Sequence, residues 1–163
     1  MATLGNILVR KGGTAMTGRE VTLTLAIPSP KDGAPTVSAA TVLLLPVSES
    51  RKAAAFRAAE AFIAECERVA SETGEPSKAP SREDERGLRF LCEAMRDAED
   101  ARKFFVEADK IDAFRDIVIA EQIRLLLSEY DQLISNEYAE VREKRELLEM
   151  REQAQATFQP GQG

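Results

Sequence analysis

A long C-terminal stretch of this chain without a helix-breaking residue constrains its fold most. Between Lys110 and Gln159 there is no glycine or proline, the two residues least favourable inside a helix. This stretch predicts one continuous helix of roughly 40 residues, which at about 1.5 Å per residue would be near 60 Å long. Such a helix is longer than a domain of this mass is wide, so its far end should project or pack on another protein.

Apolar residues are distributed unevenly along this predicted helix. The first part, to about Ile134, is apolar on more than one face and should be covered by several neighbours. The second part keeps only a narrow seam, in which Tyr138, Val141 and Leu148 lie among many charged residues. This pattern is typical of a coiled-coil arm or a docking helix, and it also suits a solvated extension held by local ion pairs.

Three segments before residue 48 have the pattern of β-strands. The clearest is Glu20–Ile27, because its apolar and polar residues alternate with a period of two. Val37–Val47 is the second and Asn6–Arg10 a shorter third, and a proline-rich loop over 28–36 lets the first two pair as a hairpin. Three strands do not make a domain alone, so a helix must cover their apolar face, and the segment after Ser48 should supply it.

Two further helices are predicted between this sheet and the long C-terminal helix. The first runs from about 49 to 72, after the N-cap candidate Ser48. Residues 73–81 contain glycine and prolines and break this helix. Ser81 and Asp84 then resemble a capping box at the start of a second helix, which should reach about Phe105. The predicted fold class is α+β: a small three-stranded antiparallel sheet packed by a helix, followed by an acidic helical region with a long C-terminal helix.

The same features divide the chain into four parts. Residues 1–73 should form the sheet and first helix, 74–81 a linker, 82–152 a helical hairpin with the long last helix, and 153–163 a disordered tail. The net charge of −6 resides in the helical part, because residues before 49 carry four basic and two acidic side chains. This acidic surface is either simply solvated or a face for a basic partner. Nucleic acid is disfavoured, because phosphate binding needs clustered positive charge.

The N-terminal sequence and the cysteines indicate a cellular compartment. "MATLGNILVRKGG" lacks the basic segment and apolar run of a signal peptide, and no apolar run is long enough to span a membrane. Cys66 and Cys92 each fall on an apolar helical stripe and are expected to be buried thiols, although a disulfide between them stays open. We therefore expect a cytoplasmic protein, in whatever cell makes it.

The composition argues against most catalysis. The chain has no histidine, which is the commonest general base near neutral pH and the commonest transition-metal ligand. Two cysteines without histidine are too few for a structural zinc site. Helix capping and solvated faces explain two acidic clusters better than a magnesium site does. These clusters are Asp109, Asp112 and Asp116, and Glu93, Asp97 and Asp100. We expect no enzyme activity, no cofactor and no metal.

Function is therefore expected to reside in contacts with other proteins. We predict a partner-binding surface made of aromatic and aliphatic side chains, with the alternative that most of the phenylalanines form the core. The predicted residues are Tyr130, Tyr138, Val141, Leu148, Phe104 and Phe62. The seam over 138–152 would also allow the chain to form homo-oligomers.

One stretch of the sequence resembles a known family. "VLLLPVSESRKAAAFRAAEAFIAE", followed by an acidic helical body, resembles tail assembly chaperones of long-tailed bacteriophages over roughly residues 20–135, mainly at Leu43–Pro46 and Arg51–Glu65. The resemblance implies a small, acidic, non-enzymatic protein, often with a frameshifted longer form. It would bind the tape-measure protein and keep its hydrophobic helices in solution until tail-tube subunits polymerise around it. The alternatives are an acidic adaptor or inhibitor of a basic host or phage protein, and a structural subunit that oligomerises through its C-terminal helix.

Overall fold

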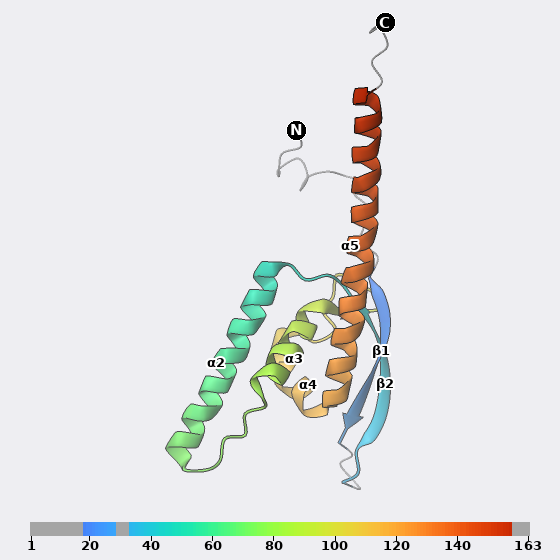
Figure 1. The fold of residues 1–163 in the computed structure, drawn as a ribbon. Helices are drawn as coiled ribbons and strands as arrows, with labels where there is room; N and C mark the ends of the chain where they lie inside the picture. The colour runs from blue at the N-terminus through green and yellow to red at the C-terminus, as the bar shows by residue number, and fades with distance from the viewer. Residues whose placement is uncertain (1–17, 29–32, 158–163) are drawn as a thin grey trace, which may run out of the picture.

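The computed structural model describes residues 18–28 and 33–157, except for the side chains of Glu137, Tyr138 and Thr157. The elements are β1 (Arg19–Ile27), β2 (Thr36–Leu44), α2 (Glu49–Thr73), α3 (Arg82–Ala94), β3 (Met95–Asp97), the 3-10 turn η1 (Ala108–Lys110), α4 (Ile111–Ile117) and α5 (Ala120–Thr157). Figure 1 shows a body in which α3, α4 and the first half of α5 lie between the sheet and α2, while the rest of α5 extends beyond that body. The α+β fold class is confirmed.

The sheet has three antiparallel strands in the order β1-β2-β3. The predicted hairpin of β1 and β2 is confirmed, with Leu23 opposite Ala40 and Val21 opposite Val42. Leu23, Val42 and Leu44 are completely buried, because the period of two turns one apolar face of the hairpin toward the helices.

The third strand differs from the one that the sequence predicts. The candidate Asn6–Arg10 lies outside the described residues, and the third strand of the described part is Met95–Asp97, inside the segment predicted to be helical as far as Phe105. Met95 leaves the helix with φ −83° and ψ 130°, and β3 then pairs with Val42–Leu44. The pairing gives β2 backbone hydrogen bonds that a continuing helix could not provide.

Helix α2 has its predicted bounds but not its predicted place. The Ser48 hydroxyl accepts a hydrogen bond from the Arg51 amide at 3.4 Å, and Gly74 ends the helix with φ 72°. The helix packs on α3, whereas α5 and α4 lie against β1 of the sheet. The buried stripe of α2 is Ala55, Ala59 and Ile63, and its two alanines suit close packing of two helices better than cover for a sheet.

The long C-terminal helix is interrupted where the sequence predicts continuity. Helix α4 ends at Ile117, and Val118 is extended, with φ −81° and ψ 136°, and bridges to Leu25 of β1. Three successive β-branched residues, Ile117 to Ile119, weaken the helix at this point, and the bridge to the sheet stabilises the extended alternative. Helix α5 still has 38 residues and is about 57 Å long.

The body has one hydrophobic core, to which residues on both sides of the 74–81 segment contribute. Its most enclosed side chains are Leu23, Val42, Leu44, Leu91, Ala94 and Met95. A hydrogen bond also joins the two sides of that segment, because the amide of Val47 donates to the Tyr130 hydroxyl at 2.8 Å. The connection from β2 to α2 is thus fixed to α5.

A buried glutamate ties the helices of the body together. Glu85 on α3 is only 1 % exposed and is the single buried charged residue in the described part of the chain. Its carboxylate accepts hydrogen bonds from Arg89 Nε and Arg115 Nε, each at 2.9 Å. The Arg115 guanidinium also lies 3.8 Å from the centre of the Phe62 ring on α2. One ion cluster therefore joins α2, α3 and α4.

The two cysteines differ in exposure, which predicts a difference in reactivity. Both are free thiols, with Cys92 buried in α3 and Cys66 half-buried on α2. Burial raises the pKa of the Cys92 thiol to about 12, so almost no reactive thiolate forms near neutral pH. We expect iodoacetamide to label Cys66 in the folded protein and Cys92 only after unfolding, as followed by mass spectrometry of tryptic peptides. Equal labelling rates in the folded protein would contradict this expectation.

Candidate protein-binding surface

Helix α5 consists of a half that belongs to the core and a half that does not. Ile123, Leu126, Tyr130 and Leu133 are buried against the rest of the body. From Ser135 to Ala156, every side chain that the structure describes is exposed. Figure 1 shows this far half rising beyond the body. It nevertheless carries four large hydrophobic side chains, each 58–65 % exposed: Val141, Leu147, Leu148 and Met150. Apolar groups held out on a rigid helix are typical of an interaction surface.

Two of these four residues continue an apolar row that begins in the body. Leu127, Ile134, Val141 and Leu148 follow one another at steps of seven residues, the spacing of one side of a coiled coil. From here on we call this row of four residues the seam; it begins in the body, unlike the narrower seam predicted over 138–152. Leu127 and Ile134 are half-buried and pack at the border of the core, whereas Val141 and Leu148 have no cover in the described structure. The seam therefore leads from the core out along the projecting half.

Leu147 and Met150 lie on a different side of α5. At about 100° per residue, Met150 is half a turn around the helix from Val141, and Leu147 is about a third of a turn away. The projecting half is thus apolar on two sides. The seam is the side with a continuation into the body, so it offers the longer contact surface.

A groove of about 530 Å³ opens at the base of the seam, between α2, α3 and α5. Its apolar lining is Phe56, Phe90, Leu127 and Tyr130, and its charged lining is Lys52, Arg82, Glu83, Arg86 and Asp131. Gly87 lies between α3 and α5, where an added Cβ would be 3.0 Å from Cδ1 of Leu127. The glycine therefore allows α3 and α5 to approach closely beneath the groove. We call the cavity between α2, α3 and α5 the groove.

Tyr130 and Phe62, two of the predicted contact residues, already have partners within the chain. Tyr130 is buried, accepts the hydrogen bond from Val47, and packs edge-to-face on Phe90 with ring centres 4.8 Å apart. Only part of Tyr130 borders the groove. Phe62 is half-buried under the guanidinium of Arg115, and Arg89 lies 5.5 Å from its ring centre. These contacts give both residues a structural role in the body.

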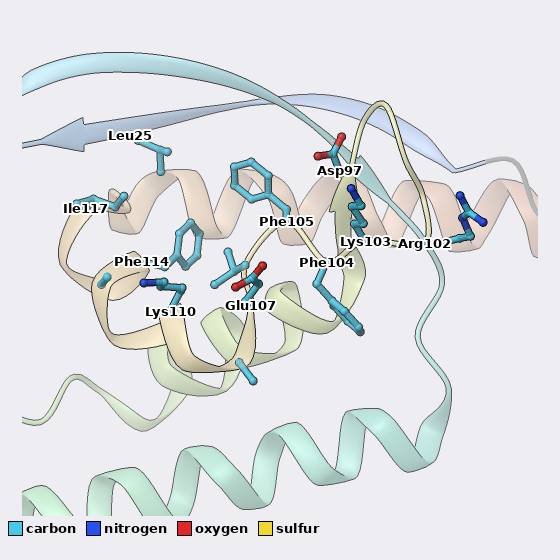
Figure 2. Close-up of a pocket in the computed structure, with 13 residues that line it drawn as sticks. Leu25, Asp97, Arg102, Lys103, Phe104, Phe105, Glu107, Lys110, Phe114 and Ile117 are labelled. Carbon is cyan, nitrogen blue, oxygen red and sulfur yellow. The ribbon is translucent and has the colours of Figure 1, made fainter.

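Phe104 borders a second and larger cavity, of about 940 Å³, beside the sheet. Figure 2 shows the rings of Phe105 and Phe114 facing this cavity near Leu25 and Ile117, whereas Phe104 points away from them. Phe104 is 39 % exposed, and the Arg96 guanidinium lies 3.9 Å from its ring centre. The charged side chains Asp97, Arg102, Lys103, Glu107 and Lys110 surround the apolar centre of this cavity.

The predicted contact residues therefore occupy separate places. Val141 and Leu148 share the exposed seam, and the side chain of Tyr138, between them in sequence, lies outside the described residues. Tyr130, Phe62 and Phe104 lie at the groove, at the α2–α4 contact and at the larger cavity. Leu127 and Ile134 were not among the predicted residues, although the seven-residue spacing in the sequence could have revealed them.

Neither of the two acidic clusters forms a metal site in the described residues. No three His, Cys, Asp or Glu side chains there lie close enough together to hold a metal ion. Asp112 is paired with Arg115 at 2.6 Å, and Asp97 accepts backbone hydrogen bonds from Glu99 and Asp100 in a turn. These carboxylates stabilise helix ends and turns.

Comparisons of the chain with protein-family models, with curated proteins and with solved structures gave no match. Within the part of the chain that the structure describes, no helix has the length and apolar character needed to cross a membrane.

Proposed function

We propose that this chain is a non-catalytic protein-binding protein that holds a helix of another protein along α5. The projecting half of α5 carries this proposal, because it exposes large apolar side chains on a rigid helix that the body does not cover. Burying a leucine-sized side chain contributes about 1.5–3 kcal/mol, so even a few of these residues would stabilise a complex appreciably. Helix-on-helix docking is a common way of recognising an amphipathic partner.

The specific instance that we propose is a tail assembly chaperone of a long-tailed phage. The resemblance over Leu43–Pro46 and Arg51–Glu65 supports it, and so does a net charge of −6, which would help a complex with hydrophobic helices to stay in solution. In this role α5 would shield apolar helices of a tape-measure protein before the tail tube forms. The cytoplasm of a phage-infected cell is the corresponding location.

The test replaces the exposed apolar residues of α5 without changing charge. Val141, Leu147, Leu148 and Met150 would all be changed to glutamine, which has nearly the helix propensity of leucine. The variant would be co-expressed with the tape-measure-like helical protein that the chaperone proposal expects to be encoded directly downstream. We expect the unchanged chain to keep that protein in the supernatant and to co-purify with it. The quadruple variant should lose at least about ten-fold in co-purified partner, because it removes the apolar contacts that α5 offers outside the body.

A matched control changes exposed apolar residues elsewhere: Val37→Gln, Val69→Gln and Leu125→Gln together. This control should retain the partner, and both variants should have the circular dichroism spectrum of the unchanged chain. If the quadruple variant holds the partner as well as the control does, α5 is not the binding surface and the proposed function is wrong. If no tape-measure-like protein is encoded downstream, the chaperone instance is withdrawn.

A further inference from the structure

Most of the charged residues that border Leu148, at the far end of the seam, are basic, although the chain as a whole is acidic. On a helix, a residue's surface neighbours are those three and four positions away. For Leu148 these neighbours are Lys144, Arg145, Arg151 and Glu152. Lys144 and Arg145 are also neighbours of Val141, and Glu137 stands four positions before it. The far end of the seam is therefore bordered mainly by cations, on a chain whose net charge is −6.

Few of these cations are neutralised within the chain. Arg145 Nε lies 3.2 Å from Oε1 of Glu149, whereas Lys144 and Arg151 form no ion pair with any described residue. At the other end of the seam, Lys52 and Arg86 stand at the groove, 5.8 Å and 5.5 Å from the ring centre of Phe56, and Arg86 is paired with Glu60. The groove is therefore mixed in charge, with Glu60, Glu83 and Asp131 beside its cations, and the excess of positive charge lies at the far end of the seam.

A second copy of this chain fits the seam poorly. In a parallel, in-register pair, Arg145 would lie next to its own counterpart, one turn from Val141 and Leu148, where the two helices are closest. In an antiparallel pair centred near residue 144, Lys144 would meet Lys144. Like charges placed directly opposite each other destabilise helix pairs. The occupant should therefore carry the opposite charge.

We propose that the seam and the groove together bind an amphipathic helix of another protein, whose apolar stripe is bordered by glutamate or aspartate. This inference rests on the proposed function and names the chemical class of the partner segment. From Leu127 to Leu148 the track spans 22 residues of α5, or about 32 Å, so it fits a partner helix of about three heptads. Carboxylates of that helix would pair with Lys144, Arg145 and Arg151, and its end would fill the groove.

The test uses two synthetic helices of three heptads, identical except for the residues that border their leucine stripe. One has glutamate there and the other lysine, and binding to the full chain would be measured by fluorescence anisotropy at low and high salt. Non-specific attraction to a chain of net charge −6 favours the lysine helix. A preference for the glutamate helix can therefore arise only from local cations. We expect that helix to bind about ten-fold more tightly than its lysine twin at low salt, and salt to reduce the difference.

Two pairs of variants locate the contact. Changing Lys144, Arg145 and Arg151 to glutamine should abolish the preference, whereas changing Arg57, Lys78 and Arg102 to glutamine alters the net charge equally and should not. Val141→Gln with Leu148→Gln should weaken binding of the glutamate helix about ten-fold, and Leu147→Gln with Met150→Gln should leave it nearly unchanged.

Some results would overturn the inference and leave the proposed function intact. The first is tighter binding of the lysine helix than of the glutamate helix. The second is an equal loss of affinity for the glutamate helix in the Val141/Leu148 and the Leu147/Met150 double variants. The third is a dimer of this chain in light scattering that becomes a monomer on Val141→Gln with Leu148→Gln. Binding of neither helix, while the quadruple variant still loses the downstream partner, would overturn it too. The proposed function itself fails only if the quadruple variant retains the co-expressed partner as well as its control does.

Discussion

Replacing Glu85 with alanine should lower the free energy of unfolding by about 3–5 kcal/mol, because removal of one partner leaves buried charges uncompensated. The carboxylate is 1 % exposed, and the side chains of Arg89 and Arg115 that contact it are each 17 % exposed. Without the carboxylate, neither guanidinium can regain full hydration unless the helices move apart. The loss should therefore be much greater than that of a surface ion pair, which contributes about 0–1 kcal/mol.

The measurement is urea unfolding followed by far-ultraviolet circular dichroism, with Glu83→Ala as the matched control. Glu83 lies in the same first turn of α3 but is exposed, so its replacement should cost no more than about 0.5 kcal/mol. A second comparison, Asp112→Ala, removes the exposed acidic partner of Arg115 and should also have a small effect. If Glu85→Ala costs less than about 1 kcal/mol, the ion cluster does not join the helices in the way that its contacts indicate.

The parts of the fold that sequence reasoning recovers are those determined by neighbouring residues. Ser48 and Ser81 cap α2 and α3 through hydrogen bonds to amides three residues ahead, so both helix starts are visible in the local sequence. The alternation in Glu20–Ile27 likewise predicts β1, because its period needs no knowledge of the rest of the chain.

The parts that sequence reasoning misses depend on contacts between distant residues. Met95–Asp97 becomes a strand because β2 presents unpaired backbone groups beside it, more than fifty residues earlier in the chain. Val118 leaves the helix because Leu25 offers a bridge. Local propensity at Met95–Asp97 is compatible with a helix, and the β-branched run Ile117 to Ile119 only weakens one, so the folded arrangement decides between the two states.

Only part of the candidate surface could be predicted from the sequence. Val141 and Leu148 are apolar residues within a charged helix, and that contrast is visible in the sequence. The groove was not predictable, since Phe56, Gly87 and Leu127 come from three helices whose packing order is a tertiary property. The sequence also suggests an acidic binding face, whereas the neighbours of Leu148 on α5 are mostly cations. Net charge therefore describes the whole molecule and not this site.

A pair of leucines on α5 gives the second large prediction, because the same substitution should destabilise the fold in one half of the helix and not in the other. Leu126 is 1 % exposed and Leu148 is 58 % exposed. Leu126→Ala should lower the free energy of unfolding by about 2–5 kcal/mol through lost burial and a residual cavity. Leu148→Ala should change it by less than about 0.5 kcal/mol, since alanine keeps the helix and little contact is lost.

Urea unfolding of the two variants, first alone and then with the bound partner, separates folding from binding. Alone, only Leu126→Ala should shift the midpoint. With the partner present, the unchanged chain should be stabilised by mass action, and Leu148→Ala should lose part of that added stability because its complex is weaker. A loss of more than about 1 kcal/mol for Leu148→Ala in the isolated chain would mean that the far half of α5 packs on the chain itself. In that case its apolar residues would be core residues, and a partner would not be needed to cover them.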